Sequence, residues 1–153
     1  MSLALSTTAF GNGGEIPSTF TCSGADRSPL LSWTGVPKGT KSLALIMDDP
    51  DAPMGTWTHW VMWNIPAHAD GLREGVPADG VLKSGARQGR NDFRRIGYGG
   101  PCPPPGKPHR YFFRLYALDA LLDAAAGVTR SEVEKEMKGH VLAEAEWMGT
   151  YKR

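Results

Sequence analysis

The chain has 153 residues, of which 41% are hydrophobic, and we expect one globular domain over residues 1–153 with a sizeable core. Seventeen basic and sixteen acidic side chains give a formal net charge of +1, which argues against nucleic acid or an anionic membrane as the main partner. No run approaches the ~18 apolar residues of a membrane span, and the N-terminus lacks the basic start and apolar core of a signal peptide. A cytoplasmic protein is therefore predicted, or a periplasmic one only if a leader was removed.

Turn-forming residues divide the chain into short apolar runs. It contains 19 glycines and 12 prolines, a composition typical of a mostly β domain. Strands are predicted at 3–6, 29–33 and 42–47, in a run that begins at His59, and at 109–118. Residues 67–80 have loop composition, and 81–100 are predicted to form a long structured loop, a kind of segment that is often functional.

The two cysteines, Cys22 and Cys102, lie far apart in the sequence and form no C-x-x-C motif. This spacing indicates neither a zinc ribbon nor a redox pair. We therefore expect two thiols, buried or free.

Polar and aromatic side chains are densest at 46–66, between two predicted strands. Asp48, Asp49 and Asp51 fall within four positions, and three tryptophans surround His59. Few loops with a purely structural role need this chemistry, so the segment is a candidate site. The alternative is an Asx-turn connection in which the aspartates only bind their own backbone.

Two prolines should stiffen this loop, because Pro50 and Pro53 lack a backbone donor and favour extended conformations in the residues before them. His59 then opens the second strand. On the period-two rule, His59, Val61 and Trp63 share one face of that strand.

A second rigid loop, residues 101–108, holds five prolines and a glycine, so neither a helix nor a central strand can form there. An exposed proline-rich ligand for another domain is the alternative interpretation. In the strand that follows, His109 and Tyr111 share a face. Both loops thus lead into a strand that begins with a histidine.

The C-terminal part has helical signals. Asp119 is a candidate N-cap for a short helix over 120–126, which Gly127 would end. Thr129 and its capping-box partner Glu132 then predict a second helix. That helix should run at least to Lys138, and the apolar pattern lets it continue through Gly139 into 142–147.

Three motifs resemble the phosphatidylethanolamine-binding protein family, in its compact bacterial branch known as Raf-kinase-inhibitor-like: DPDAP at 49–53, THW at 58–60 and GYGGPCPPPGKPHRY at 97–111. GARQGRNDF at 85–93 is also similar, although Arg94 follows where the branch more usually has glycine. The resemblance spans most of the chain. It implies a central antiparallel β-sheet, a smaller flanking sheet and one or two short helices.

The resemblance also implies a pocket for a small anionic ligand, such as phosphate, a phosphoethanolamine-like group or a carboxylate. The ligand-binding residues it assigns are Asp49, Pro53, Trp57, His59, Gly100, Pro101, His109 and Tyr111. It makes Ala52–Pro53 a candidate cis bond. We expect Asp51, Arg87 and Arg90 to support the loops. Both histidines should bind the anion as protonated donors, so that affinity is greatest near pH 6.

A binding or regulatory module without cofactor or metal is the favoured function, and enzyme activity is the alternative. Asp49, His59 and His109 could serve an ester or phosphoester hydrolase, or hold iron or zinc as two histidines and a carboxylate. Against these, the sequence has no G-x-S-x-G elbow and no second histidine or cysteine close to either histidine. A protein partner is possible but not identified, and the resemblance implies a homodimer.

Overall fold

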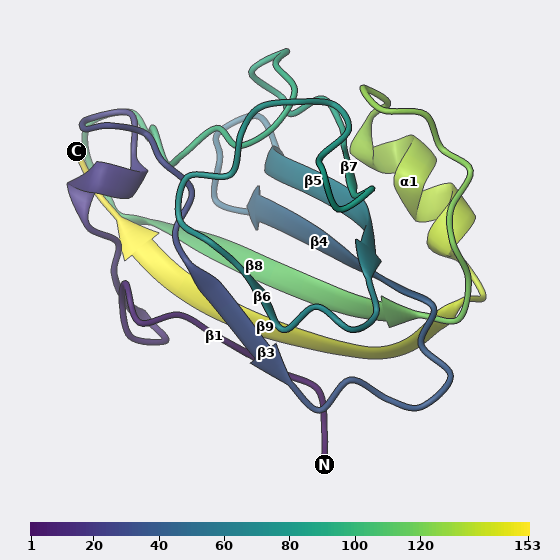
Figure 1. Cartoon of the computed structure of the whole chain (residues 1–153). Helices are drawn as coiled ribbons and strands as arrows, with labels where there is room; N and C mark the ends of the chain where they lie inside the picture. The colour runs from purple at the N-terminus through teal and green to yellow at the C-terminus, as the bar shows by residue number, and fades with distance from the viewer.

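The computed structural model describes all residues, 1–153, as two β-sheets with one α-helix and a 3-10 turn (Figure 1). The six-stranded sheet has the order β2-β9-β8-β4-β5-β7, and the three-stranded sheet has the order β1-β3-β6. The elements are β1 Ala4–Ser6, β2 Gly14–Glu15, η1 Ser18–Phe20, β3 Leu31–Thr34, β4 Ser42–Asp49, β5 Trp57–Pro66, β6 Gly71–Leu72, β7 Arg87–Gln88, β8 His109–Leu118, α1 Arg130–Met137 and β9 Val141–Tyr151. The predicted fold class is confirmed.

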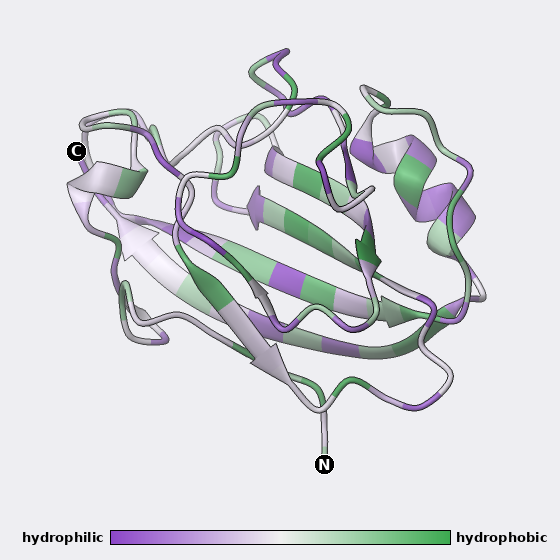
Figure 2. Cartoon of the chain, viewed as in Figure 1, coloured by the Kyte–Doolittle hydropathy of each residue, from purple (hydrophilic) through white to green (hydrophobic).

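Strand β4 lies at the centre of the large sheet, between β5 and β8, and all eight of its residues are buried. The small sheet covers one face of the large sheet and α1 covers part of the other (Figure 1). Apolar residues therefore run along β4 as far as its polar tip, Asp48 and Asp49 (Figure 2). Because both faces of β4 are covered, its two terminal carboxylates are placed in two different environments.

Two hydrophobic cores follow from this layering. The larger one lies between the sheets and includes Trp33, Leu45 and Phe113. The smaller one lies under α1, where Val133 packs with Trp63. These cores hold the ends of β4, β5 and β8 in fixed positions.

The prediction that His59 shares a face with Val61 and Trp63 is wrong. Val61 and Trp63 face the core under α1, whereas the His59 ring lies 5.3 Å from the ring of Tyr111 on the opposite face. The cause is a register shift, because Asp48 pairs with Thr58 while Met47 pairs with Trp60. The extra residue in β5 is His59, and such irregularities commonly redirect a side chain next to a functional site.

The C-terminal helix is shorter than its pattern permits. It ends at Met137, and residues 141–151 form β9, so the continuation into 142–147 is wrong. Gly139 adopts a positive φ of 84°, which ends the helix. The following residues pair with the whole length of β8, so sheet pairing overrides their helical propensity.

The predicted short helix over 120–126 is also absent. Tertiary bonds satisfy its backbone instead. The Leu122 N–H donates to Asn64 Oδ1 at 2.8 Å, and the Asp123 and Ala124 N–H groups donate to Glu136 Oε1 at 2.7 and 3.1 Å. The Asp119 carboxylate lies 2.7 Å from His140 Nδ1 and caps no helix.

Two further expectations are corrected. Cys22 and Cys102 form a disulfide rather than two thiols, because the fold brings the loop after η1 against the proline-rich loop. Ala52–Pro53 is trans, as is every other peptide bond. The turn is closed instead by the Asp51 N–H, which donates to Asp49 Oδ1 at 2.7 Å, so the Asx-type turn is present.

At eight residues, α1 is too short to cross a membrane.

Candidate functional site

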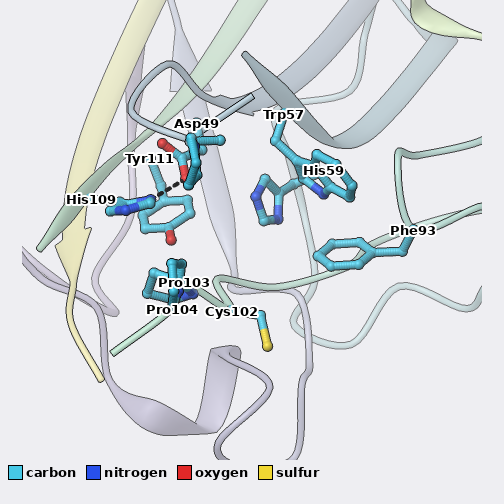
Figure 3. A pocket seen from close by; sticks show the side chains of 11 residues that line it. Asp49, Trp57, His59, Phe93, Cys102, Pro103, Pro104, His109 and Tyr111 are labelled. Atoms are coloured by element: carbon cyan, nitrogen blue, oxygen red, sulfur yellow. Dashed lines mark hydrogen bonds and ion pairs between the residues drawn. The ribbon is translucent and has the colours of Figure 1, made fainter. Parts of the chain in front are cut away.

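A cavity of about 190 Å³ lies where the ends of β4, β5 and β8 meet the two proline-containing loops (Figure 3). Its lining is mainly aromatic and proline side chains, with one carboxylate and two histidines. The lining residues are Asp49, Ala52, Pro53, Trp57, His59, Phe93, Cys102, Pro103, Pro104, His109 and Tyr111. Six of the eight predicted ligand-binding residues are thus brought together.

Asp49 and His109 form a pair across the sheet. Asp49 is the last residue of β4 and His109 the first of β8, and the His109 Nδ1–H donates to Asp49 Oδ2 at 2.6 Å. Asp49 is only 3% exposed. Because Nδ1 is occupied, the orientation of the His109 ring is fixed, and its Nε2 makes no hydrogen bond within the protein.

His59 is held differently. It exchanges two hydrogen bonds with Gly99: its Nδ1 is 2.6 Å from the Gly99 carbonyl, and the Gly99 N–H donates to the His59 carbonyl at 2.9 Å. Burial lowers the pKa of His59, and the Gly99 carbonyl opposes this only in part. His59 is therefore a neutral ring that donates from Nδ1, and its Nε2 lone pair is left for the cavity (Figure 3). Two protonated histidines were expected, and burial opposes that state at His59.

Two buried donors at the cavity have no hydrogen-bond partner, the Tyr111 hydroxyl and the Trp57 Nε1–H. No other buried side-chain nitrogen or oxygen of this chain is unpaired. Burial raises the pKa of Tyr111, and the nearby Asp49 carboxylate adds to this although the hydroxyl forms no hydrogen bond of normal geometry with it, so the hydroxyl keeps its proton. An unpaired buried donor costs ~1–3 kcal/mol, so two at one cavity point to a ligand that accepts hydrogen bonds.

The sequence reasoning missed Phe93. Its ring makes edge contacts with Trp57 and His59, at centroid distances of 5.6 and 5.3 Å. The loop around Phe93 is anchored by Asp92, whose carboxylate accepts from the Thr58 N–H at 2.6 Å. A signal was present, because Phe93 ends the GARQGRNDF motif, but the motif does not show which side chain faces the cavity.

Gly100 and Pro101 do not line the cavity. The Gly100 N–H donates to Asp26 Oδ1 at 2.9 Å, and the Pro101 carbonyl accepts from the Cys22 N–H at 3.1 Å. The next residues, Cys102 to Pro104, form the wall instead. Both predicted residues thus anchor the wall, and the backbone donor of Gly100 is already used.

The three predicted support residues have different positions. Asp51 accepts two bonds from the Arg110 guanidinium and one from its N–H, each at 2.9 Å, which joins the first loop to β8. Arg87 donates to the Ala124 carbonyl at 2.7 Å and so supports the segment before α1. The Arg90 side chain is exposed. Of the three side chains, only that of Asp51 bonds to a strand that carries a cavity residue.

The metal alternative can be compared with the geometry. No group of three histidine, cysteine, aspartate or glutamate side chains is arranged to hold a metal ion. Asp49 instead faces His109, and His59 uses Nδ1 for a backbone carbonyl. The three side chains therefore share the cavity without converging on one point.

The chain is thus a two-layer β protein with a small cavity at the strand ends. The chain belongs to the phosphatidylethanolamine-binding protein family, whose sequence profile matches residues 6–152. A UPF0098 protein of Methanothermobacter thermautotrophicus is 56% identical over 149 residues, 97% of this chain and 98% of the relative. A UPF0098 protein of Aquifex aeolicus is 52% identical, over 95% and 85% of the two chains.

Solved structures agree with this assignment. Escherichia coli YbcL, described as a new member of the mammalian PEBP family, superposes with a TM-score of 0.93 at 36% identity, over 100% of this chain and 99% of YbcL. A phosphatidylethanolamine-binding protein homologue of Chlamydia trachomatis gives a TM-score of 0.90 at 41% identity, over 99% and 98% of the chains. The resemblance that the motifs indicated is confirmed.

Proposed function

We propose that this protein binds a small anion, such as phosphate, a phosphoryl head group or a carboxylate, in the cavity between His59 and His109. The observation that carries the proposal is the pair of unpartnered donors, Tyr111 and Trp57, at one recess. An anionic oxygen accepts such bonds more strongly than a neutral one does. Ligand binding would satisfy both donors at once.

The arrangement of donors and acceptors favours a protonated phosphoryl group. Tyr111 and Trp57 can donate to two of its oxygens, whereas the neutral His59 offers a lone pair at Nε2. A phosphate monoanion or monoester carries an O–H that can donate to His59, and a carboxylate lacks this group. The cavity, about 190 Å³, is also smaller than the ~300–1,000 Å³ of sites for drug-sized ligands, so it suits a head group.

Calorimetry with inorganic phosphate, phosphoethanolamine and acetate tests the proposal on wild type and Tyr111→Phe. Loss of one bond to an anion should weaken phosphate binding about tenfold. The ligand-free variant should be at least as stable as wild type, because the removed hydroxyl has no partner. If the hydroxyl instead had a structural partner within the protein, Tyr111→Phe would be less stable than wild type.

Tyr116→Phe is the matched control. Tyr116 lies on the same strand but is half-buried on the opposite face of the sheet, so its removal should leave phosphate affinity unchanged. The proposal fails if wild type binds none of the three anions, or if both phenylalanine variants bind as wild type does.

A second candidate function is ester or phosphoester hydrolysis, favoured by the 2.6 Å bond between Asp49 and His109. A carboxylate that orients a histidine is the usual arrangement of a general base, here with Nε2 directed at a bound water. Generic phosphate and carboxyl esters should then be cleaved by wild type and not by His109→Ala. Equal background rates would remove this candidate.

Location and assembly complete the proposal. We propose a ligand-binding or regulatory module, for which the sequence predicts the cytoplasm. The Cys22–Cys102 disulfide favours an oxidising compartment instead, because disulfides persist mainly there, so cell fractionation with thiol blocking tests the predicted location. Light scattering tests the proposed homodimer, and an identified protein partner would define a regulatory role.

A further inference from the structure

The Cys22–Cys102 disulfide joins the cavity wall to another part of the chain. Cys102 lines the cavity, together with Pro103 and Pro104, whereas Cys22 lies in the exposed loop that follows η1. The two cysteines are 80 positions apart in the sequence. The position of this wall therefore depends on a covalent bond to a segment that does not itself line the cavity.

Few other bonds hold the wall. Five of the eight residues in 101–108 are prolines, which have no N–H. Gly106 donates the only backbone hydrogen bond from this segment, at 3.3 Å to the Arg153 carbonyl. The Pro101 and Pro103 carbonyls accept one bond each, the second from Arg153 Nε at 2.6 Å. Without the disulfide, only these three hydrogen bonds and the burial of Pro101 and Pro103 would keep the segment against the cavity.

The two cysteine residues differ in exposure. Cys22 is exposed and Cys102 is only partly so. An incoming thiolate reaches the exposed side of a disulfide more easily, and exposed disulfides are the ones most readily exchanged. Attack at Cys22 would release the Cys102 thiol beside the cavity.

We propose that Cys22–Cys102 is a redox modification site that sets the affinity of the cavity for its anion, which rests on the function proposed above. A dithiol reductant attacks Cys22 Sγ and forms a mixed disulfide, and the Cys102 thiolate leaves and takes up a proton. The second thiol of the reductant then displaces Cys22. In total, two electrons and two protons pass to the protein, and the reductant becomes a cyclic disulfide. The reduced wall leaves its binding position, and affinity falls.

The test measures the affinity for inorganic phosphate by calorimetry on three samples: oxidised wild type, wild type reduced by a dithiol, and the double variant Cys22→Ser/Cys102→Ser. If the released wall holds the binding arrangement a tenth of the time, reduced protein and double variant should bind about tenfold more weakly. The reductant should not change the double variant further. Hydrogen exchange of peptides from 98–109 should rise on reduction.

Val133→Ala is the control for general destabilisation. Val133 is a buried residue of α1, on the opposite face of the large sheet from the cavity, so its truncation lowers the melting temperature without touching the cavity. It should bind phosphate as oxidised wild type does. Equal phosphate affinity of oxidised and reduced wild type, or unchanged exchange in 98–109, overturns the redox proposal. Absence of phosphate binding in every sample overturns the proposed function and this inference with it.

Discussion

Asp48 and Asp49 are neighbours at the end of β4, exposed by 1% and 3%, and they face opposite sides of the large sheet. Asp48 accepts two bonds from Arg114, both at 3.1 Å, and one from Arg130 at 2.8 Å. Asp49 has one histidine and the N–H of Asp51. The same residue type, equally buried, thus forms a closed ion cluster on one face and borders an open cavity on the other.

Burial alone does not mark a functional carboxylate. Around Asp48 no buried donor lacks an acceptor, because both arginines donate to its carboxylate. Beside Asp49, two donors remain unpaired in the protein. Unfulfilled bonding capacity, rather than charge or burial, separates the candidate site from a structural one.

The largest effect is expected where the closed cluster is broken. Asp48→Ala leaves two guanidinium groups without their carboxylate, and we expect a stability loss of about 3 kcal/mol, at the low end for buried pairs because both arginines reach solvent. Asp49→Ala should cost less, about 1 kcal/mol, because it removes hydrogen bonds but leaves no guanidinium group without its carboxylate. Urea unfolding of both variants measures the difference. Equal losses of unfolding free energy in the two variants would contradict the distinction between the two carboxylates.

Ligand affinity, in contrast to stability, should depend on the residues beside Asp49. His109→Gln removes the ring nitrogen that the protein leaves unbonded at the cavity, so phosphate affinity should fall about tenfold, as for loss of one hydrogen bond to an anion. Because burial lowers the pKa of His59, the phosphate affinity of His59→Gln should vary with pH above ~6.5 as that of wild type does. Calorimetry at several pH values measures both effects. An affinity of His109→Gln equal to that of wild type would contradict the assignment.

The stability of the ligand-free protein in acid reports on His59 without any contribution from a ligand. Burial lowers its pKa in the folded state, so the unfolded chain binds the extra proton first. Stability should therefore fall as the pH drops below ~6.5, the ordinary value for histidine, and level off below the lowered pKa. His59→Gln should show a shallower fall over this window than wild type. Parallel curves in urea unfolding between pH 4 and 7.5 would show that His59 is not the group responsible.

Local patterns in the sequence predicted most strands and the cavity's histidines, because alternation and proline-rich loops depend on neighbouring residues. Residues 109–118 form the predicted strand. What the sequence could not show depends on contacts distant in the chain. The register shift that turns His59 towards Tyr111 arises from pairing with β4, and the disulfide arises from the packing of two loops. Likewise, nothing in the Asp48–Asp49 dipeptide shows which carboxylate meets two arginines.

The smallest effect is expected for the two arginines that were predicted to support the site. Arg87→Ala removes a bond to the Ala124 carbonyl and should cost about 1 kcal/mol of stability, and Arg90→Ala should cost less because its side chain is exposed. Neither guanidinium lines the cavity, so phosphate affinity of the double variant should stay within about twofold, the usual range for a surface change. Lys135→Ala/Lys138→Ala on α1 is the control for lost positive charge. A tenfold loss of phosphate affinity in the arginine double variant alone would mean that the 85–95 loop, through Phe93, positions the cavity more strongly than its contacts indicate.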